Sequence, residues 1–157
     1  MITVIFVCMG NICRSPMAEA IFSDLVKKES LESQITIDSV GTIGYHSGNP
    51  AHSGTRRILE QHNIHYQGHS RKITPSDFQK ADYLVAMDDD NINALERLDV
   101  QKLHAARYLK LLDFATDTPL RNVPDPYYHD NFDEVYTLVL DGCQGLLTFL
   151  KNTHFQL

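Results

Sequence analysis

The feature that most constrains the fold is the segment spanning residues 7–16, VCMGNICRSP, which joins an expected strand to an expected helix. Residues 3–8 form a continuous apolar and β-branched run, which is typical of a central parallel strand buried on both faces. Ser15 and Pro16 look like a helix N-cap followed by proline at the first helical position. A loop between a strand end and a helix N-terminus turns backbone N–H groups inward, so this segment predicts an anion-binding nest.

The same segment carries residues suited to covalent phosphate chemistry. Cys8 ends the strand, and Arg14 follows six residues later with a planar guanidinium that can bind two oxygens of one phosphate. The helix N-terminus and Arg14 together favour the nucleophilic thiolate form of Cys8. Gly10 is expected to permit backbone angles that other residues resist, and Ser15 to donate a hydrogen bond to the Cys8 sulfur. The expected phosphate-binding residues are Met9, Gly10, Asn11, Ile12, Cys13, Arg14 and Ser15.

The cysteines do not indicate a disulfide framework. The chain has 3, an odd number, and no secretion signal is recognised. Cys13 lies on the same tight loop as Cys8, where a reversible disulfide between them would protect Cys8 from irreversible oxidation. A small loop side chain without a redox role is the alternative for Cys13. Cys143 falls on the apolar face of the last expected helix, which indicates a core residue.

Beyond this segment, expected strands alternate with expected helices along the chain. Further strands are predicted over residues 35–40, 83–87 and 108–112. Helices are predicted over residues 15–30, 53–62, 75–80 and 132–152, and from the acidic run at 88–90 onward. Residues 113–130 are expected to be irregular. This alternation predicts an α/β fold of three layers, with a four-stranded parallel sheet between helices and the phosphate-binding loop after the first strand. No linker divides residues 1–157, so a single domain is expected.

The overall composition narrows the possible partners. The net charge of −6 argues against a nucleic-acid binder, which needs a basic patch. No apolar stretch approaches the roughly 20 residues of a membrane span, so a soluble, cytoplasmic protein is expected. His62, His65 and His69 are close in sequence, but no cysteine or carboxylate set completes a metal site. We therefore expect no metal and no cofactor.

Four ordered motifs resemble those of the low-molecular-weight protein tyrosine phosphatases, and the resemblance covers nearly the whole chain. They are VCMGNICRSPMAE at residues 7–19, DSVGT at 38–42, MDDDN at 87–91 and DPYY at 125–128. The resemblance implies that Cys8 attacks phosphorus and that Asp125 first protonates the leaving phenolate and then activates water. It also implies a phosphotyrosine-containing protein as substrate, inhibition by phosphate or other oxyanions, and a monomer.

Supporting residues follow from the same resemblance. Asn11 resembles the residue that holds the phosphate loop in shape, and Ser39 the residue that hydrogen-bonds to it. Tyr45 and Tyr127 resemble aromatic residues that wall the substrate slot. The family commonly places a loop-anchoring histidine where this chain has Gly68, so His69, one residue later, is the candidate replacement.

Three other functions fit the sequence less well. An arsenate reductase would need further accessible cysteines, whereas only Cys13 and Cys143 remain. Phosphoarginine phosphatases resembling this scaffold tend to carry threonine where this chain has Ile12, and the bulkier side chain favours a flat ring. A phosphopeptide-binding module would more naturally lack Cys8 or Asp125.

Overall fold

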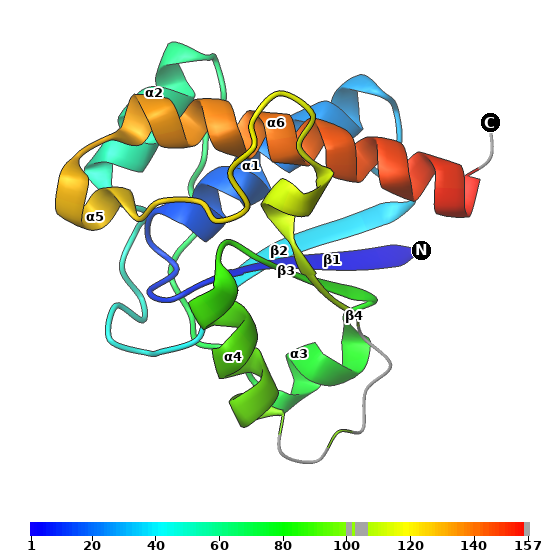
Figure 1. Ribbon diagram of the computed structural model, residues 1–157, viewed down its shortest axis with the longest axis horizontal. Helices are drawn as coiled ribbons and strands as arrows, with labels where there is room; N and C mark the ends of the chain where they lie inside the picture. The colour runs from blue at the N-terminus through cyan, green and yellow to red at the C-terminus, as the bar shows by residue number, and fades with distance from the viewer. Residues whose placement is uncertain (100–101, 103–106, 156–157) are drawn as a thin grey trace.

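The computed structural model describes residues 1–99, 102 and 107–155. Within these residues the strands form one parallel sheet in the order β2-β1-β3-β4, flanked by helices (Figure 1). The strands are β1 (Ile2–Cys8), β2 (Ile35–Gly41), β3 (Tyr83–Ala86) and β4 (Arg107–Lys110). The helices are α1 (Arg14–Lys28), α2 (Ser53–Gln61), α3 (Pro75–Lys80), α4 (Asp89–Leu98), α5 (Pro126–His129) and α6 (Phe132–Leu150), with a 3₁₀ turn at Leu111–Phe114 and a π turn at Lys151–Phe155.

Three layers result, as predicted. Figure 1 shows α1, α2 and α6 on one face of the sheet and α3 and α4 on the other. The central strand β1 supplies both cores, because successive side chains of a strand point to opposite faces. Val4 and Phe6 belong to the cluster under α1 and α6, whereas Ile5 and Val7 belong to the cluster under α3 and α4. Burial on both faces explains the continuous apolar run of this strand.

Helix α1 begins earlier than the sequence predicted. Cys13, not Ser15, is the N-cap residue, and no side-chain hydrogen bond caps the helix there. The hydroxyl of Ser15 instead contacts the Cys8 sulfur. The N–H groups of the first turn, which normally need an external partner, are thereby left for an anion.

The fourth strand is also shorter than predicted. It ends at Lys110, and the following Leu111 and Leu112 turn into a 3₁₀ helix and are fully buried against α6. Gly142 of α6 permits this approach, since an added Cβ would lie 2.6 Å from Leu111 Cγ. The stretch predicted as irregular, residues 113–130, contains the end of this turn and the short helix α5.

Capping interactions define two helix starts near the site. Thr74 and Asp77 form a capping box at the start of α3. Asp88 caps α4 through a hydrogen bond from the Asn91 N–H group to its Oδ1 atom, at 2.8 Å. Asp88 therefore stands just beyond the carboxyl end of β3, where ligands of open α/β sheets bind.

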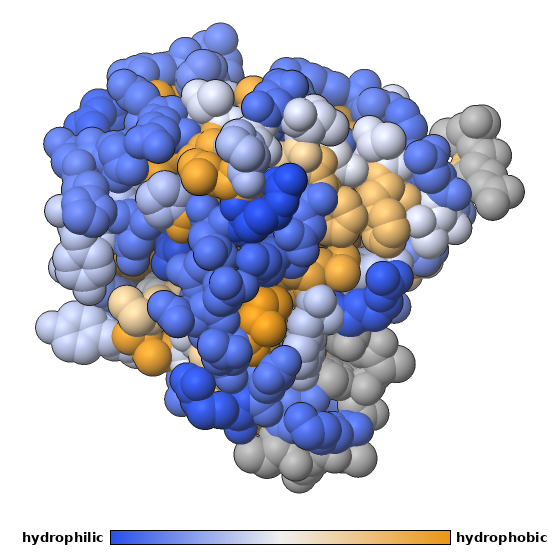
Figure 2. Space-filling view, in the orientation of Figure 1, coloured by the Kyte–Doolittle hydropathy of each residue, from blue (hydrophilic) through white to orange (hydrophobic). Residues whose placement is uncertain are grey.

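The surface is largely hydrophilic in the view of Figure 2, with apolar residues gathered in separate patches. The described part of the chain contains no helix with the length and apolar character required to span a bilayer.

Candidate active site

The loop between β1 and α1 turns its carbonyl groups outward. Backbone N–H groups of Thr42, Ile43 and His52 donate to the carbonyls of Cys8, Met9 and Ile12 at 3.0, 3.1 and 2.7 Å. Side-chain hydroxyls of Ser70 and Thr55 donate to the carbonyls of Gly10 and Cys13 at 3.0 and 3.1 Å. Because the surrounding segments take up the carbonyls, the loop N–H groups are left to face its interior, which is the arrangement of an anion nest.

Cys8 is buried at the centre of this loop. Its sulfur accepts a hydrogen bond from the Asn11 backbone N–H group at 3.3 Å and lies 3.0 Å from the Ser15 hydroxyl oxygen. The Asn11 side-chain amide donates to that oxygen at 2.7 Å, and the Ser15 hydroxyl proton can be shared between the sulfur and the Val40 carbonyl, which lies 3.4 Å away. Both contacts stabilise a negative charge on sulfur.

Asn11, rather than Gly10, takes the unusual backbone conformation of the loop, with φ of 56° in the left-handed region. Its Oδ1 atom accepts from the Arg71 N–H group, and its amide donates to the Ser39 hydroxyl, both at 3.0 Å. The expectation that Gly10 supplies the unusual backbone angles of the loop was therefore wrong. The ring of His46 packs closely against Gly10, with His46 Cδ2 3.0 Å from where a Cβ would stand, so a larger residue there would have to shift this ring.

Arg14 lies beneath the pocket with its side chain 4% exposed. Its Nη1 group donates to Asp88 Oδ2 at 2.6 Å and to the Val123 carbonyl at 2.9 Å, and Nη2 lies 3.5 Å from Asp125 Oδ2. Burial alone would lower the pKa of Arg14, but the neighbouring Cys8 sulfur and the carboxylates raise it above its ordinary value. The guanidinium is therefore a fixed positive charge with a set direction.

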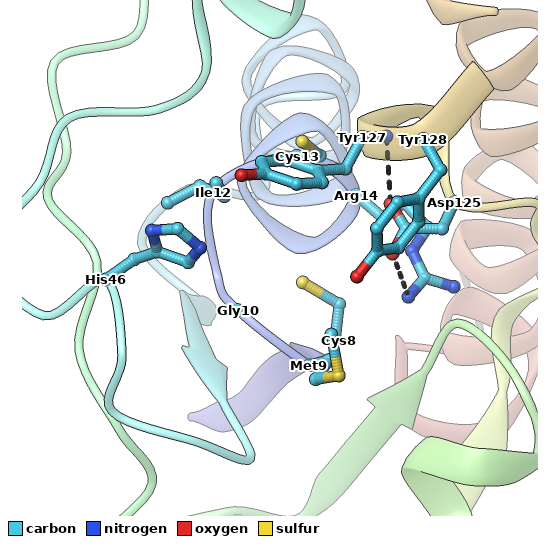
Figure 3. Close-up of a pocket in the computed structure, with 10 residues that line it drawn as sticks. All are labelled: Cys8, Met9, Gly10, Ile12, Cys13, Arg14, His46, Asp125, Tyr127 and Tyr128. Carbon is cyan, nitrogen blue, oxygen red and sulfur yellow. Dashed lines mark hydrogen bonds and ion pairs between the residues drawn. The ribbon is translucent and has the colours of Figure 1, made fainter. Parts of the chain in front are cut away.

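Figure 3 shows how the side chains surround the pocket over Cys8. Asp125 caps α5, its Oδ1 atom accepting from the Tyr127 N–H group at 3.0 Å, and its Oδ2 atom lies beside Arg14 on the same side of the pocket. Tyr127 and Tyr128 form the wall on the α5 side, and His46 the wall opposite. The pocket is lined by Cys8, Met9, Gly10, Ile12, Cys13, Arg14, His46, Asp125, Tyr127 and Tyr128.

Of the two tyrosines predicted to wall the slot, only Tyr127 lines this pocket. Tyr45 is 84% exposed and packs edge-to-face on the His46 ring, with ring centroids 4.8 Å apart. Tyr45 thus supports the wall from outside. No pattern in the sequence singles out His46, because a lone histidine in a loop of glycine, serine and proline carries no chemical signature.

The other cysteines occupy different surroundings. Cys13 lines the pocket but is buried, and burial together with the charge of Cys8 raises the pKa of its thiol to about 12. Cys143 is fully buried on α6, where its thiol contacts the Ala18 carbonyl at 3.8 Å, so the predicted core position is confirmed.

His69 is exposed, and its backbone pairs with Pro50. The carboxylate of Glu19, which accepts from the Ser39 hydroxyl at 2.6 Å, instead receives a hydrogen bond from Tyr66. Tyr66 and Asp88 are residues whose place in the site the sequence did not indicate. The sequence indicates Asp88 only as part of a helix start and of the motif at residues 87–91.

A cysteine in an anion nest, an arginine beneath it and a carboxylate at the rim define a cysteine-dependent phosphatase on a parallel α/β sheet. The chain belongs to the low molecular weight phosphotyrosine protein phosphatase family, whose sequence profile matches residues 3–155.

Individual relatives agree with this assignment. The low molecular weight protein-tyrosine-phosphatase YfkJ of Bacillus subtilis is 47% identical over 152 residues, covering 96% of this chain and 97% of that protein. The low molecular weight protein-tyrosine-phosphatase PtpA of Staphylococcus aureus is 40% identical over 152 residues, covering 96% of this chain and 94% of that protein. The crystal structure of YfkJ superimposes with a TM-score of 0.93 at 46% identity, covering 98% of this chain and 97% of that one.

Proposed function

We propose that this protein removes phosphate from phosphotyrosine in protein substrates through a phosphocysteine formed at Cys8. The observation that carries the proposal is the position of the Cys8 sulfur in a loop where the surrounding segments take up five backbone carbonyls, those of Cys8, Met9, Gly10, Ile12 and Cys13. A phosphate dianion entering this loop meets backbone N–H groups, the helix N-terminus and Arg14, and its phosphorus faces the sulfur.

In the first step, the Cys8 thiolate attacks phosphorus while the bond from phosphorus to the phenolic oxygen breaks. Asp125 gives its proton to that oxygen, and tyrosine leaves. Asp125 is suited to this because it stands at the pocket rim beside Arg14, above the sulfur. The phosphate then replaces Asp125 as the partner of Arg14, which frees the carboxyl group to turn to the leaving oxygen.

In the second step, a water molecule attacks the phosphocysteine, and Asp125 takes its proton. Inorganic phosphate and the Cys8 thiolate are the products, with Asp125 protonated again for the next cycle. The Ser15 hydroxyl stabilises the departing thiolate through its contact with the sulfur. One carboxyl group thus serves both steps, as general acid and then as general base.

Selection of phosphotyrosine follows from the depth and shape of the pocket. The reactive sulfur lies at its base, and the rings of Tyr127 and Tyr128 stand edge-to-face on the α5 side of the pocket, with centroids 5.2 Å apart. A phenyl phosphate is long enough to reach the sulfur, whereas phosphoserine is shorter. Ile12 lines the pocket, and its bulky side chain favours a flat ring over the branched guanidinium of phosphoarginine. Phosphate and vanadate should bind in the same loop as inhibitors.

The test is to measure turnover on phosphotyrosine, phosphoarginine and phosphoserine peptides with identical flanking residues. We expect kcat/KM on phosphotyrosine to exceed the other two by at least about two orders of magnitude, the scale at which a binding site discriminates on shape and polar contacts. Preference for phosphoarginine or phosphoserine would overturn the proposed substrate.

A further inference from the structure

The hydrogen bonds that support the phosphate loop continue beyond Ser39 to a tyrosine. The Asn11 amide donates to the Ser39 hydroxyl at 3.0 Å, and Ser39 donates to Glu19 Oε1 at 2.6 Å. The Tyr66 hydroxyl donates to the same Glu19 oxygen at 3.0 Å. This relay joins the loop, β2, α1 and the segment between α2 and α3.

The direction of each hydrogen bond in the relay is defined. Burial raises the pKa of Tyr66, so its hydroxyl keeps its proton and acts as a donor. With Tyr66 and Ser39 both donating to Glu19, the lone pairs of the Ser39 oxygen are left to accept from Asn11. Asn11 in turn keeps its left-handed backbone, from which its N–H group reaches the Cys8 sulfur at 3.3 Å.

The space that the Tyr66 ring occupies exists because residue 68 is glycine. An added Cβ on Gly68 would lie 2.2 Å from the Tyr66 hydroxyl oxygen and 2.5 Å from Cζ, so any side chain there displaces the ring. The ring also packs against the core cluster under α1 and α6. Tyr66 and Gly68 therefore form a matched pair, since one supplies the donor and the other supplies room for it.

We infer that Tyr66 is a positioning residue for catalysis, which acts through Glu19 and Ser39 to hold Asn11 and the phosphate loop in their binding shape. The inference rests on the phosphate loop proposed above. It assigns to Tyr66 the loop-anchoring role that the sequence suggested for His69, which lies exposed.

The test uses Tyr66→Phe, which keeps the ring and removes only the hydroxyl. Loss of the hydrogen bond to Glu19 should loosen the support of the loop, and we expect an approximately tenfold fall in kcat on p-nitrophenyl phosphate, which corresponds to about 1.4 kcal/mol. We also expect weaker binding of inorganic phosphate, and alkylation of Cys8 by iodoacetate that requires higher pH. Gly68→Ala, which displaces the ring, should change all three in the same direction.

The matched control is Tyr108→Phe. Tyr108 also donates its hydroxyl to a carboxylate, Asp99 Oδ2 at 2.8 Å, but it lies on β4, two strands away from β1. This control should leave kcat, phosphate binding and the alkylation profile unchanged, while melting temperatures report any general loss of stability.

Two outcomes overturn the role of Tyr66. One is a Tyr66→Phe enzyme with the phosphate affinity and alkylation profile of the wild type, and the other is an equal change in Tyr108→Phe. Failure of the wild-type protein itself to bind phosphate would instead overturn the proposed loop, so the two results are distinguishable.

Discussion

Arg14 Nη1 donates a hydrogen bond to Asp88 Oδ2 across 2.6 Å, which joins the first turn of α1 to the residue that caps α4. The other carboxylate oxygen of Asp88 accepts from the Asn91 N–H group at 2.8 Å. Asp88 is therefore held at both oxygens. The direction of the guanidinium is set by the framework of the protein before any substrate binds, which is the condition for bidentate recognition of phosphate.

Asp88→Asn should weaken catalysis without dismantling the fold. The amide keeps one oxygen for the cap of α4 but loses the charge that orients Arg14, and breaking a partly buried charge pair is costly. We expect kcat/KM on p-nitrophenyl phosphate to fall about tenfold to hundredfold, which corresponds to roughly 1.4–2.7 kcal/mol.

Asp89→Asn is the matched control for this change. Asp89 is the next residue, but its carboxylate is mostly exposed and pairs with Lys110 at 2.8 Å, away from Arg14. Its replacement should leave kcat/KM within about twofold of the wild type, since exposed ion pairs contribute little. Equal losses in the two variants would show that negative charge near the start of α4, and not the specific contact with Asp88, supports Arg14.

Cys8→Ser should abolish turnover and preserve phosphate binding. A serine hydroxyl is not ionised at neutral pH and is a poor nucleophile without a base, whereas the loop N–H groups and Arg14 remain. Calorimetry should find phosphate binding within about tenfold of the wild type, with no phosphatase activity above background. Turnover near the wild-type rate would exclude Cys8 as nucleophile.

Asp125→Ala should slow substrates according to their leaving groups. A tyrosine leaving group needs a proton, and general acids contribute about 10²–10⁴-fold to such steps. A substrate with a strongly electron-withdrawn phenol needs little protonation. We therefore expect kcat to fall at least about a hundredfold on a phosphotyrosine peptide and much less on 2,4-dinitrophenyl phosphate. An equal fall on both substrates would remove Asp125 from the acid role.

The sequence predicted the sheet and the phosphate loop because local patterns specify both. The buried run before Cys8 and the Ser15-Pro16 dipeptide mark a strand end and a helix start with residues adjacent in the chain. Even so, the helix begins at Arg14, because the Ser15 hydroxyl bonds to the Cys8 sulfur and does not act as the cap. This contact depends on the folded loop and has no sequence signature.

Residues distant in sequence were predicted only through family resemblance or were missed. Asp125 is an ordinary turn residue by composition, and only the folded chain brings it to Arg14. Tyr66 was missed because its role depends on the space left by Gly68, a tertiary complementarity invisible to periodicity or capping rules. His46 was missed in a similar way, because its place in the pocket depends on packing against Gly10 in the folded chain.

Asp77 should contribute stability that depends on pH. Burial alone would raise its pKa, but hydrogen bonds from Arg71 at 2.9 Å and from Thr74 at 2.8 Å hold the pKa of this carboxyl below its usual range. A depressed folded-state pKa means that the stabilisation is present above about pH 4 and is lost as pH falls through the folded pKa. Asp77→Asn should therefore lower the free energy of unfolding by about 1–3 kcal/mol at pH 7, and by less near pH 3.

Urea unfolding at the two pH values checks this expectation for Asp77. Asp24→Asn is the control, because half-buried Asp24 pairs with the exposed Lys28 one helical turn away, at 2.9 Å, and its replacement should change stability by no more than about 0.5 kcal/mol. The same destabilisation of Asp77→Asn at both pH values would contradict an ionic contribution.

Cys13 should form a disulfide with oxidised Cys8, at a rate that rises with pH. Peroxide converts the Cys8 thiolate to a sulfenic acid, and the Cys13 thiolate then attacks that sulfur, releasing hydroxide and forming the disulfide. The pKa of Cys13 is raised to about 12, chiefly by burial, so its thiolate is scarce at neutral pH and increases about tenfold per pH unit. Disulfide formation from the sulfenic acid should accordingly be slow at pH 6.5 and faster at pH 8.5.

Mass spectrometry after a brief peroxide pulse measures this step, and dithiothreitol should restore activity to the disulfide form. Cys13→Ser should accumulate sulfinic and sulfonic acid at Cys8 and lose recoverable activity. Cys143→Ser is the matched control, because that thiol is fully buried on α6 and should leave recovery as in the wild type. Sulfonic acid at Cys8 of the wild type, without a link to Cys13, would mean that burial isolates the second thiol and that Cys13 is simply a small loop side chain.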